Sequence, residues 1–381
     1  MKKFDVIIIG TGQAGKPLAL ALAAKGWKTA IVEERFVGGT CINYGCTPTK
    51  AMIGSAKTAY TAMNSGIFGI NTGKVSVDLK SVVARKNRIV SQFRKGSTDS
   101  LESSRNITLI KGTAEFVDGE TIKIALRDKE QLLQSKTIVI NTGAKPFIPQ
   151  IEGLADSGYL TSETILDIKE IPEHLIILGG GYIALEFAQM FSRFGARVTV
   201  LEKSLQFLPR EDEEISEEVK KLLEGEGVKI LTGVNTTAIN RLSKNKLNVK
   251  MEHEGKVKNL NGSDLLCAVG ITPSTEKLNL RFAGVKTDKK GYIKVNNKLE
   301  TSEKGIYAAG DVKGGPAFTH IAYDDYRILF NNLTAQNKIT TRGRMVPYVL
   351  FTDPELARVG LTEQQALEEG YKIKRAVIPM T

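Results

Sequence analysis

The chain has 381 residues, 41% of them hydrophobic and 25% charged, and a formal net charge of +11. This length exceeds one ordinary core and indicates two or three globular domains. No stretch approaches the roughly 18 apolar residues of a membrane span. Lysine and arginine form no basic run with the interleaved aromatics of a nucleic-acid surface, and three cysteines cannot build a secreted disulfide framework. We therefore expect a cytoplasmic protein that binds neither membrane nor nucleic acid.

The N-terminal part predicts a strand, a helix and a second strand in succession. Residues 4–9 form an apolar, β-branched run, residues 16–25 are rich in alanine and leucine, and residues 28–32 are again apolar. This order indicates a βαβ unit. The first apolar run is too short, and too soon interrupted by glycine, to resemble a signal peptide.

The turn between the first strand and the helix has the spacing of a dinucleotide-binding loop. It reads GTGQAG. Gly10 permits the tight bend, Gly12 lets a pyrophosphate approach the backbone, and Gly15 lets the helix pack closely on the strand. The free N–H groups at the helix start would bind the phosphates. Glu33, at the end of the second strand, is placed to accept hydrogen bonds from a ribose.

Two of the three cysteines, Cys41 and Cys46, lie in the stretch GGTCINYGCTPTK directly after this unit. A zinc site needs about four ligands, and the spacing of the other cysteine and the histidines supports none. In the cytosol a disulfide is more often catalytic or sensory than structural, and two functionally unrelated buried cysteines are a further alternative. We favour a redox pair, because it would lie beside the cofactor that the first turn binds.

The strand, glycine turn and helix return about 170 residues later. Residues 175–178 and 197–201 predict strands, residues 183–194 predict a helix, and the turn reads GGGYIA. Glu202 follows the second strand. A carboxylate there accepts from an adenosine 2′-hydroxyl and repels a 2′-phosphate, so we expect NADH. The neighbouring Lys203 leaves NADPH possible.

Two dinucleotide sites in one chain indicate a flavin that is held permanently and a nicotinamide that comes and goes. Residues 263–273 and 301–311 look like strands, and we expect them to complete the first unit. A third segment opens near residues 342–347 and holds a strand, a helix and part of another strand. We expect residues 376–381, AVIPMT, to end inside that last strand.

The cysteine stretch resembles the active-site segment of the flavin-dependent pyridine nucleotide–disulfide oxidoreductases, a family that includes dihydrolipoamide dehydrogenase, glutathione reductase and mercuric reductase. Three more segments match its motifs in order: NTGA at 141–144, TSEKGIYAAGD at 301–311 and VPYVLFTDPELARVGLTE at 346–363. The segment FTHIAYDDYRILF at 318–330 is more similar to mercuric-reductase-like and reactive-chlorine-resistance flavoproteins than to the glutathione or lipoamide branches.

The resemblance implies an α/β fold with two Rossmann-like units, which bind FAD and NAD(P), and the start of an α+β dimer-interface domain. The expected limits are 1–149 for the first part of the FAD-binding domain, 150–267 for the NAD(P)-binding domain, 268–341 for the second part of the FAD-binding domain, and 342–381 for an incomplete dimerisation domain. It also implies that the full-length protein is a homodimer.

The resemblance assigns roles to the central residues. Cys41 would be the interchange thiol that meets the acceptor, and Cys46 the charge-transfer thiol beside the flavin. Lys50, one helical turn beyond Cys46, would approach flavin N5 and pair with Glu186. Tyr182 would cover the nicotinamide pocket, although a core-packing role is its plain alternative. Positive charge and a helix N-terminus near the thiols agree with these roles, because both lower a thiol pKa.

The cofactor-binding residues that the two turns and the resemblance imply are Gly10, Gly12, Gly15, Glu33, Gly39, Thr40, Lys50, Ala114, Thr142, Gly143, Gly179, Gly181, Tyr182, Ile183, Glu186, Glu202, Gly270, Asp311, Ala317, Phe318, Thr319 and His320. No resident metal ion is expected.

Two departures from the family pattern affect the expected reaction. Disulfide-reducing members use a histidine base near the C-terminus that acts on the other subunit, and this chain ends at Thr381, before such a motif. Two interpretations follow: the chain is truncated, or its reaction dispenses with the base. We favour truncation, in which case the chain would be inactive through loss of the histidine. The family segment G-R-x-P-N reads GITPS at 270–274.

The sequence therefore predicts an FAD-dependent oxidoreductase. Electrons would pass from NADH through the flavin to the Cys41–Cys46 disulfide, and then to a small-molecule disulfide or a soft metal ion. The alternatives are an FAD-binding redox sensor and an NADH oxidase that does not use the two thiols.

Overall fold

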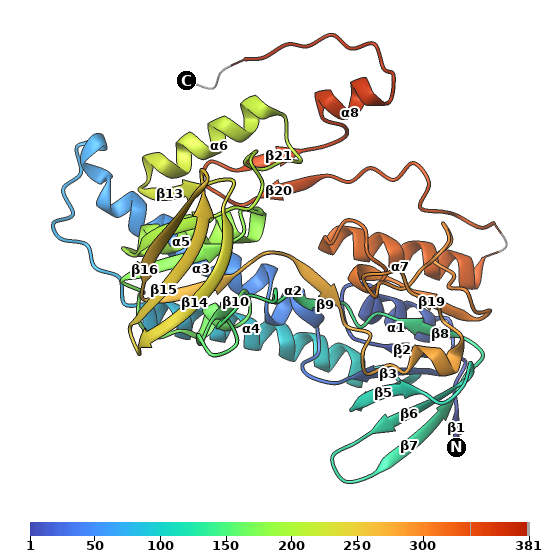
Figure 1. Cartoon of the computed structure of the whole chain (residues 1–381). Helices are drawn as coiled ribbons and strands as arrows, with labels where there is room; N and C mark the ends of the chain where they lie inside the picture. The colour runs from blue at the N-terminus through green and yellow to red at the C-terminus, as the bar shows by residue number, and fades with distance from the viewer. Residues whose placement is uncertain (336, 379–381) are drawn as a thin grey trace.

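The computed structural model describes residues 1–335 and 337–378. Two parallel five-stranded sheets organise it, one at the lower right and one at the upper left of Figure 1. The first sheet has the strand order β19-β8-β2-β3-β4, and its strands span Ile306–Ala308, Ile138–Ile140, Val6–Ile9, Thr29–Glu33 and Ile107–Lys111. The second has the order β10-β17-β11-β12-β13, with strands Leu160–Thr161, Asp264–Cys267, His174–Leu178, Arg197–Leu201 and Val228–Leu231.

Alternate residues of the first sheet enter two different cores. Val6 and Ile8 face α1 (Gly15–Ala24) and α7 (Thr319–Thr334). Ile7 and Ile9 face a four-stranded sheet on the other side. That sheet has the order β1-β7-β6-β5, with strands Lys2–Lys3, Glu130–Gln134, Thr121–Ala125 and Thr113–Phe116. A strand covered on both faces reads as a continuous apolar run, as VIII does in β2.

The second sheet is covered in the same way. Leu175 and Ile177 of β11 face α5 (Tyr182–Phe194), α3 (Cys46–Met63) and α4 (Leu79–Glu102). Ile176 and Leu178 face an antiparallel three-stranded sheet, drawn yellow in Figure 1, whose strands are β14 (Asn235–Ser243), β15 (Lys246–His253) and β16 (Lys256–Gly262). Each parallel sheet is therefore sandwiched between helices and a second sheet, which is antiparallel except that β1 pairs with β7 in parallel.

The remaining elements are short or peripheral. They are α2 (Gly39–Asn43), η1 (Ser65–Phe68), β9 (Ala144–Pro146), η2 (Thr164–Asp167), α6 (Glu213–Gly225), β18 (Ile271–Pro273), η3 (Leu280–Ala283), η4 (Gly310–Lys313), β20 (Tyr348–Leu350), β21 (Leu356–Arg358) and α8 (Glu363–Glu368).

Three expectations about strands need correction. Residues 263–273 form two strands instead of one, because the chain bends at Gly270, whose φ is +133°. β17 joins the second sheet, so it does not complete the first unit, and β18 pairs with β9. The stretch 301–311 forms only β19, which does join the first sheet beside β8, before it turns into η4.

The third segment begins with the hairpin β20–β21, and α8 follows it. Residues 376–378 form no strand, and residues 379–381 lie outside the described part of the chain. The exact domain limits stay a prediction.

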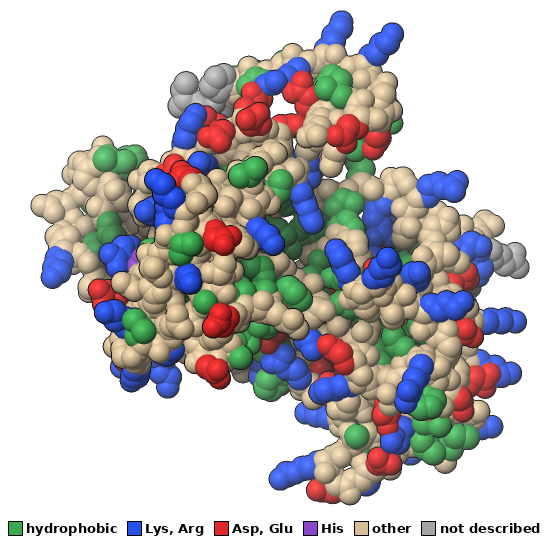
Figure 2. All heavy atoms as spheres, in the orientation of Figure 1, with side chains coloured by type: hydrophobic (Ala, Val, Ile, Leu, Met, Phe, Trp, Pro, Cys, Tyr) green, Lys and Arg blue, Asp and Glu red, His purple; other side chains and the backbone are tan. Residues whose placement is uncertain are grey.

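The surface charge is mixed. On the face shown in Figure 2, Lys and Arg side chains are spread widely and interspersed with Asp and Glu. No described helix is both long and apolar enough to cross a bilayer.

Candidate redox-active site

The cysteine stretch lies against the first glycine turn. Thr11 Oγ1 accepts a hydrogen bond from the Gly38 N–H at 3.0 Å and donates to Glu33 Oε2 at 2.5 Å. A Cβ on Gly39 would lie 2.7 Å from Gly12 Cα, and Gly39 has a φ of +64°. This close approach explains the glycines before the cysteines and places Cys41 beside the turn, within α2.

Cys46 has the environment of a stabilised thiolate. It is the first residue of α3, where the helix dipole favours negative charge. Its sulfur lies 3.1 Å from Thr319 Oγ1. A hydrogen bond from the Cys41 thiol, the Thr319 hydroxyl and the positive charge of Lys50 together lower the pKa of Cys46 to about 6, against the effect of burial. The pKa of Cys41 is raised, because its proton is shared with Cys46 and because it is buried.

The predicted contact between Lys50 and Glu186 is present. Lys50 Nζ lies 2.7 Å from Glu186 Oε2, although the residues are 136 positions apart. Lys50 follows Cys46 by four residues on α3, and the Glu186 side chain on α5 is only 4% exposed. The pair therefore places a fixed cation one helical turn from the Cys46 sulfur.

The two predicted acids hold their glycine turns by the same two hydrogen bonds. Glu33 accepts from the Thr11 N–H at 3.1 Å and from the amide two residues after itself at 2.9 Å. Glu202 accepts from the Gly180 N–H at 2.5 Å and from the amide two residues after itself at 2.7 Å. A carboxylate has about four acceptor sites, so each keeps capacity for ribose hydroxyls.

Asn141 braces the first turn, a role that the sequence reasoning missed. Its Oδ1 accepts from the Gly15 N–H and its Nδ2 donates to the Ala309 carbonyl, both at 2.8 Å. A Cβ on Gly12 would meet this Oδ1 at 2.9 Å, and one on Gly10 would meet the Asn141 carbonyl oxygen at 2.2 Å. The glycines of the turn thus leave room for a side chain as well as for a ligand.

A buried hydroxyl and a carboxyl lie near the first turn, and the start of α5 forms part of the second. Thr142 Oγ1 is buried without a hydrogen-bond partner in the described chain. Burial raises the pKa of the Asp311 carboxyl in η4. The first N–H groups of α1 are already bonded, to Asn141 Oδ1 and to the Gly12 and Ala14 carbonyls, whereas α5 shows no side-chain cap in the described structure. An orphaned hydroxyl and an uncapped helix start of this kind suit a phosphate-containing ligand.

The aromatic residues assigned to the site lie together. Tyr182 begins α5, and its ring centroid lies 5.8 Å from that of Phe318. Burial raises the pKa of Tyr182 to about 12. Phe318 also stacks on His320 at 5.5 Å and on Tyr348 at 5.7 Å. Tyr348 comes from the C-terminal segment, and neither the turns nor the resemblance had indicated it.

The other predicted residues divide between the two units. Ala114 is buried in β5, and Gly179 makes a close turn against Ala268, whose carbonyl oxygen a Cβ would meet at 2.6 Å. Gly270 lies on the exposed connection between β17 and β18. Thr40 follows Gly39 in α2, Gly143 follows Thr142, Gly181 and Ile183 flank Tyr182, and Ala317 precedes Phe318. Their roles as cofactor ligands stay a prediction.

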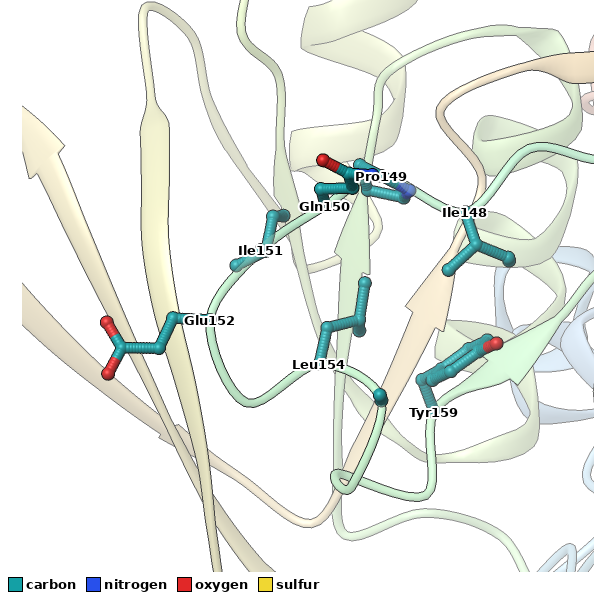
Figure 3. Close-up of a pocket in the computed structure, with 8 residues that line it drawn as sticks. Ile148, Pro149, Gln150, Ile151, Glu152, Leu154 and Tyr159 are labelled. Atoms are coloured by element: carbon teal, nitrogen blue, oxygen red, sulfur yellow. The ribbon is translucent and has the colours of Figure 1, made fainter.

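One surface hollow lies apart from these residues. It encloses about 540 Å³ beside the connector between the two parallel sheets and is lined by Ile148, Pro149, Gln150, Ile151, Glu152, Leu154, Ala155 and Tyr159. Figure 3 shows Glu152 pointing away from it. None of the predicted site residues lines this hollow.

Comparison with known proteins identifies the family. Residues 4–325 match the model of the pyridine nucleotide-disulphide oxidoreductases, and residues 346–381 match the dimerisation domain of that family. The chain is 39% identical over 377 residues to a mercuric reductase of Staphylococcus aureus, a match that covers 99% of the chain and 68% of that protein. It is 38% identical to the probable pyridine nucleotide-disulfide oxidoreductase RclA of Escherichia coli, covering 100% of the chain and 82% of RclA.

A solved structure of a related protein supports the same family assignment. The structure described as a Cu(II) complex of the HOCl-induced flavoprotein disulfide reductase RclA of Escherichia coli matches with a TM-score of 0.89 and 38% identity, over 97% of this chain and 80% of that one. The chain belongs to the pyridine nucleotide-disulphide oxidoreductase family, and Cys41 and Cys46 are its redox cysteine pair.

Proposed function

We propose that this chain passes two electrons from NADH, by way of FAD, to the Cys41–Cys46 disulfide and on to a disulfide or a soft metal ion. The observation that supports this best is the setting of Cys46, with its sulfur at the start of α3 and 3.1 Å from Thr319 Oγ1. A low thiol pKa in a partly buried, electropositive site is the mark of a reactive cysteine.

The residues at the first turn fit FAD. The glycines leave the backbone open to a pyrophosphate, Glu33 keeps acceptor capacity for a ribose, and the Thr142 hydroxyl, which is buried without a partner in the described chain, can bond a ligand. When bound, FAD would accept a hydride and supply electrons to the sulfur pair. Gly179 and Glu202 at the second turn would hold NADH, and the charge of Glu202 would oppose a 2′-phosphate.

The side chains at the site would divide the work. Lys50, held by Glu186, supplies positive charge where negative charge develops. The Cys41 thiol passes its shared proton to the Cys46 thiolate, attacks an acceptor disulfide, forms a mixed disulfide and releases one thiolate. Cys46 gives that proton to the released thiolate, attacks the Cys41 sulfur, releases the second thiolate and restores the Cys41–Cys46 disulfide. The acceptor gains two electrons and the pair loses two.

A soft metal ion is the other acceptor class. Paired thiolates select soft ions, and the relatives include mercuric reductases and a protein whose solved structure is described as a Cu(II) complex. In this chain Cys41 and Cys46 would bind such an ion as substrate. His320, next to Thr319 in the chain, is exposed to solvent.

Anaerobic titration with NADH tests the proposal. The wild-type protein, loaded with FAD, should develop a long-wavelength charge-transfer band, and Cys46→Ser should lose the band. Cys41→Ser should keep FAD but lose turnover with oxidised glutathione, lipoamide and Hg(II). Cys267→Ser is the matched control, because this thiol is buried at the end of β17.

The alternatives give different results. Rapid flavin reduction without the band, and with unchanged turnover in Cys41→Ser, would favour an NADH oxidase. No reduction by NADH at all would favour a redox sensor. A protein that takes up no FAD would exclude the proposal.

A further inference from the structure

Helix α5 carries a buried polar stripe along an otherwise apolar sequence. Glu186, Gln189 and Arg193 recur at i, i+3 and i+7, so they share one helix face. Their exposed fractions are 4%, 3% and 5%. Buried polar groups require partners, and here the partners come from far along the chain.

Helix α3 presents a second polar stripe, which faces the polar stripe of α5. Lys50 and Lys57 are seven residues apart, and Tyr60 lies on the following turn. Lys50 Nζ contacts Glu186 at 2.7 Å, and the Arg193 guanidinium lies 4.1 Å from the centre of the Tyr60 ring. The two helices thus face each other along matched polar positions.

The segment 351–353 of the C-terminal region lies between these stripes. The Gln189 side chain binds the backbone of this segment. Its Nε2 donates to the Asp353 carbonyl at 3.0 Å, and its Oε1 accepts from the Asp353 N–H at 2.9 Å. The Asp353 carboxylate pairs with Arg193 and with Lys57, both at 2.9 Å. Arg193 also pairs with Glu226 at 2.6 Å. The segment is therefore fixed at its Asp353 end from both helices.

The other end of the segment reaches the ion pair of the proposed site. The Phe351 N–H donates to Glu186 Oε1 at 3.2 Å, while the other oxygen of that carboxylate holds Lys50. The Phe351 ring centre lies 4.4 Å from Lys50 Nζ, within cation–π range. One residue therefore contacts both members of the pair.

We propose that Phe351 is a positioning residue for hydride transfer, and that Gln189 and Arg193 act through it by fixing Asp353. The inference rests on the proposed function. Phe351 holds the Lys50 ammonium and the Glu186 carboxylate in one geometry and excludes water from one side of the cation. A charge in a less polar setting interacts more strongly with developing charge.

If the segment 351–353 were only anchored to the two helices, fewer contacts than those observed would be enough. Docking of the segment needs Gln189, Arg193 and the Asp353 contacts, but it does not need an aromatic ring over Lys50. The Phe351 ring and the Phe351 N–H both contact the Lys50–Glu186 ion pair. Of the polar contacts around this segment, that ion pair is the one to which we assign a role in hydride transfer. Removal of the ring therefore separates the two roles.

The test uses the FAD-loaded chain and stopped-flow reduction by NADH without oxygen. Phe351→Leu removes the ring and keeps the N–H, and the limiting rate of flavin reduction should fall about 2- to 30-fold, the range of a cation–π contact. Phe351→Tyr keeps the ring and should restore the rate. Gln189→Met should lower it in the same direction. Phe282→Leu is the matched control, since Arg281 lies 4.8 Å from the exposed Phe282 ring.

A second readout needs no bound cofactor. In the apoprotein, brief labelling with an amine-reactive ester, followed by peptide mass spectrometry, should show several-fold faster labelling of Lys50 in Phe351→Leu than in wild type or Phe351→Tyr. Lys95, which is 77% exposed, serves as the internal reference.

The outcomes distinguish this inference from the proposed function. If NADH reduces the wild type and Phe351→Leu at the same limiting rate, or if Lys50 labelling does not change, the positioning role of Phe351 is refuted and the proposed function stands. If NADH does not reduce the FAD-loaded wild type, the proposed function itself is refuted, and this inference falls with it.

Discussion

A single hydroxyl group contributes to the acidity of Cys46. Thr319 and Thr334 are the first and last residues of α7, and only Thr319 reaches the sulfur. We expect Thr319→Val to raise the pKa of Cys46 above about 6, because the thiolate loses a donor. The thiolate absorbance of the reduced protein, followed against pH, measures this. Thr334→Val is the control, since among the described residues its hydroxyl bonds only the Phe330 carbonyl, and equal pKa values in both variants would contradict the assignment.

The same pKa predicts how stability depends on pH. An unfolded thiol binds its proton up to about pH 8.5, whereas folded Cys46 releases it above about 6. The contribution of Cys46 to stability is therefore fully present above about pH 8.5 and is lost as the pH falls through about 6. Cys41, with its raised pKa, stays protonated in both states over this range. Chemical denaturation of the reduced protein should show this rise with pH, and Cys46→Ser should lack it.

Nucleotide choice also depends on one residue. Glu202→Gln keeps an acceptor for the Gly180 N–H but removes the negative charge. We expect the ratio of kcat/KM for NADPH to that for NADH to rise about tenfold, the effect of about 1.4 kcal/mol. Steady-state kinetics with both nucleotides measure it. Wild-type protein that uses both equally well would contradict the expected preference.

At the scale of elements, the strands and helices that adjoin a glycine turn could be predicted from the sequence. The strands β2, β3, β11 and β12 and the helices α1 and α5 were expected within one or two residues, because apolar runs and glycine turns mark both ends. The antiparallel strands β5–β7 and β14–β16 and the long helix α4 were not expected. Each presents a polar face to solvent, so it lacks the continuous apolar run by which the buried strands were recognised.

The site was predictable to a similar degree. Cys41, Cys46 and the two glycine turns follow from local spacing, and Lys50–Glu186 from the family resemblance. Asn141, Gln189, Arg193 and Phe351 depend on contacts between residues more than 30 positions apart in the chain. The only local signal was Gln189 and Arg193 on an otherwise apolar helix, where polar residues indicate buried partners.

Asn141 joins the first turn to Ala309, directly after β19, and this brace makes a prediction at the scale of elements. Asn141→Ala would leave the Gly15 N–H and the Ala309 carbonyl without their partner in a buried place. We expect a loss of about 1–3 kcal/mol of unfolding free energy and weaker FAD binding, measured by urea denaturation and by flavin fluorescence. Asn248→Ala, which removes an exposed bond to Asn261, should cost less than about 0.5 kcal/mol. Equal losses in the two variants would exclude the brace.

At the scale of the whole molecule, the charge of +11 predicts how NADH arrives. A cationic protein attracts an anionic nucleotide, and salt screens that attraction. We expect kcat/KM for NADH to fall several-fold as ionic strength rises from about 0.01 to 0.15 M, while the limiting rate of flavin reduction stays constant. An uncharged dihydronicotinamide should show no such dependence. A flat response with NADH would show that the excess charge does not guide it.

The paired hydrogen bonds of Glu33 and Glu202 have a consequence for the release and rebinding of nucleotides. Each acid bonds one amide of its own turn and the amide two residues after itself, with no help from a ligand. These bonds keep the shape of the loop when a nucleotide departs. The second turn can be emptied and refilled at every round, and the first should regain its yellow colour after dialysis against salt and renewed exposure to FAD, with no refolding step in between.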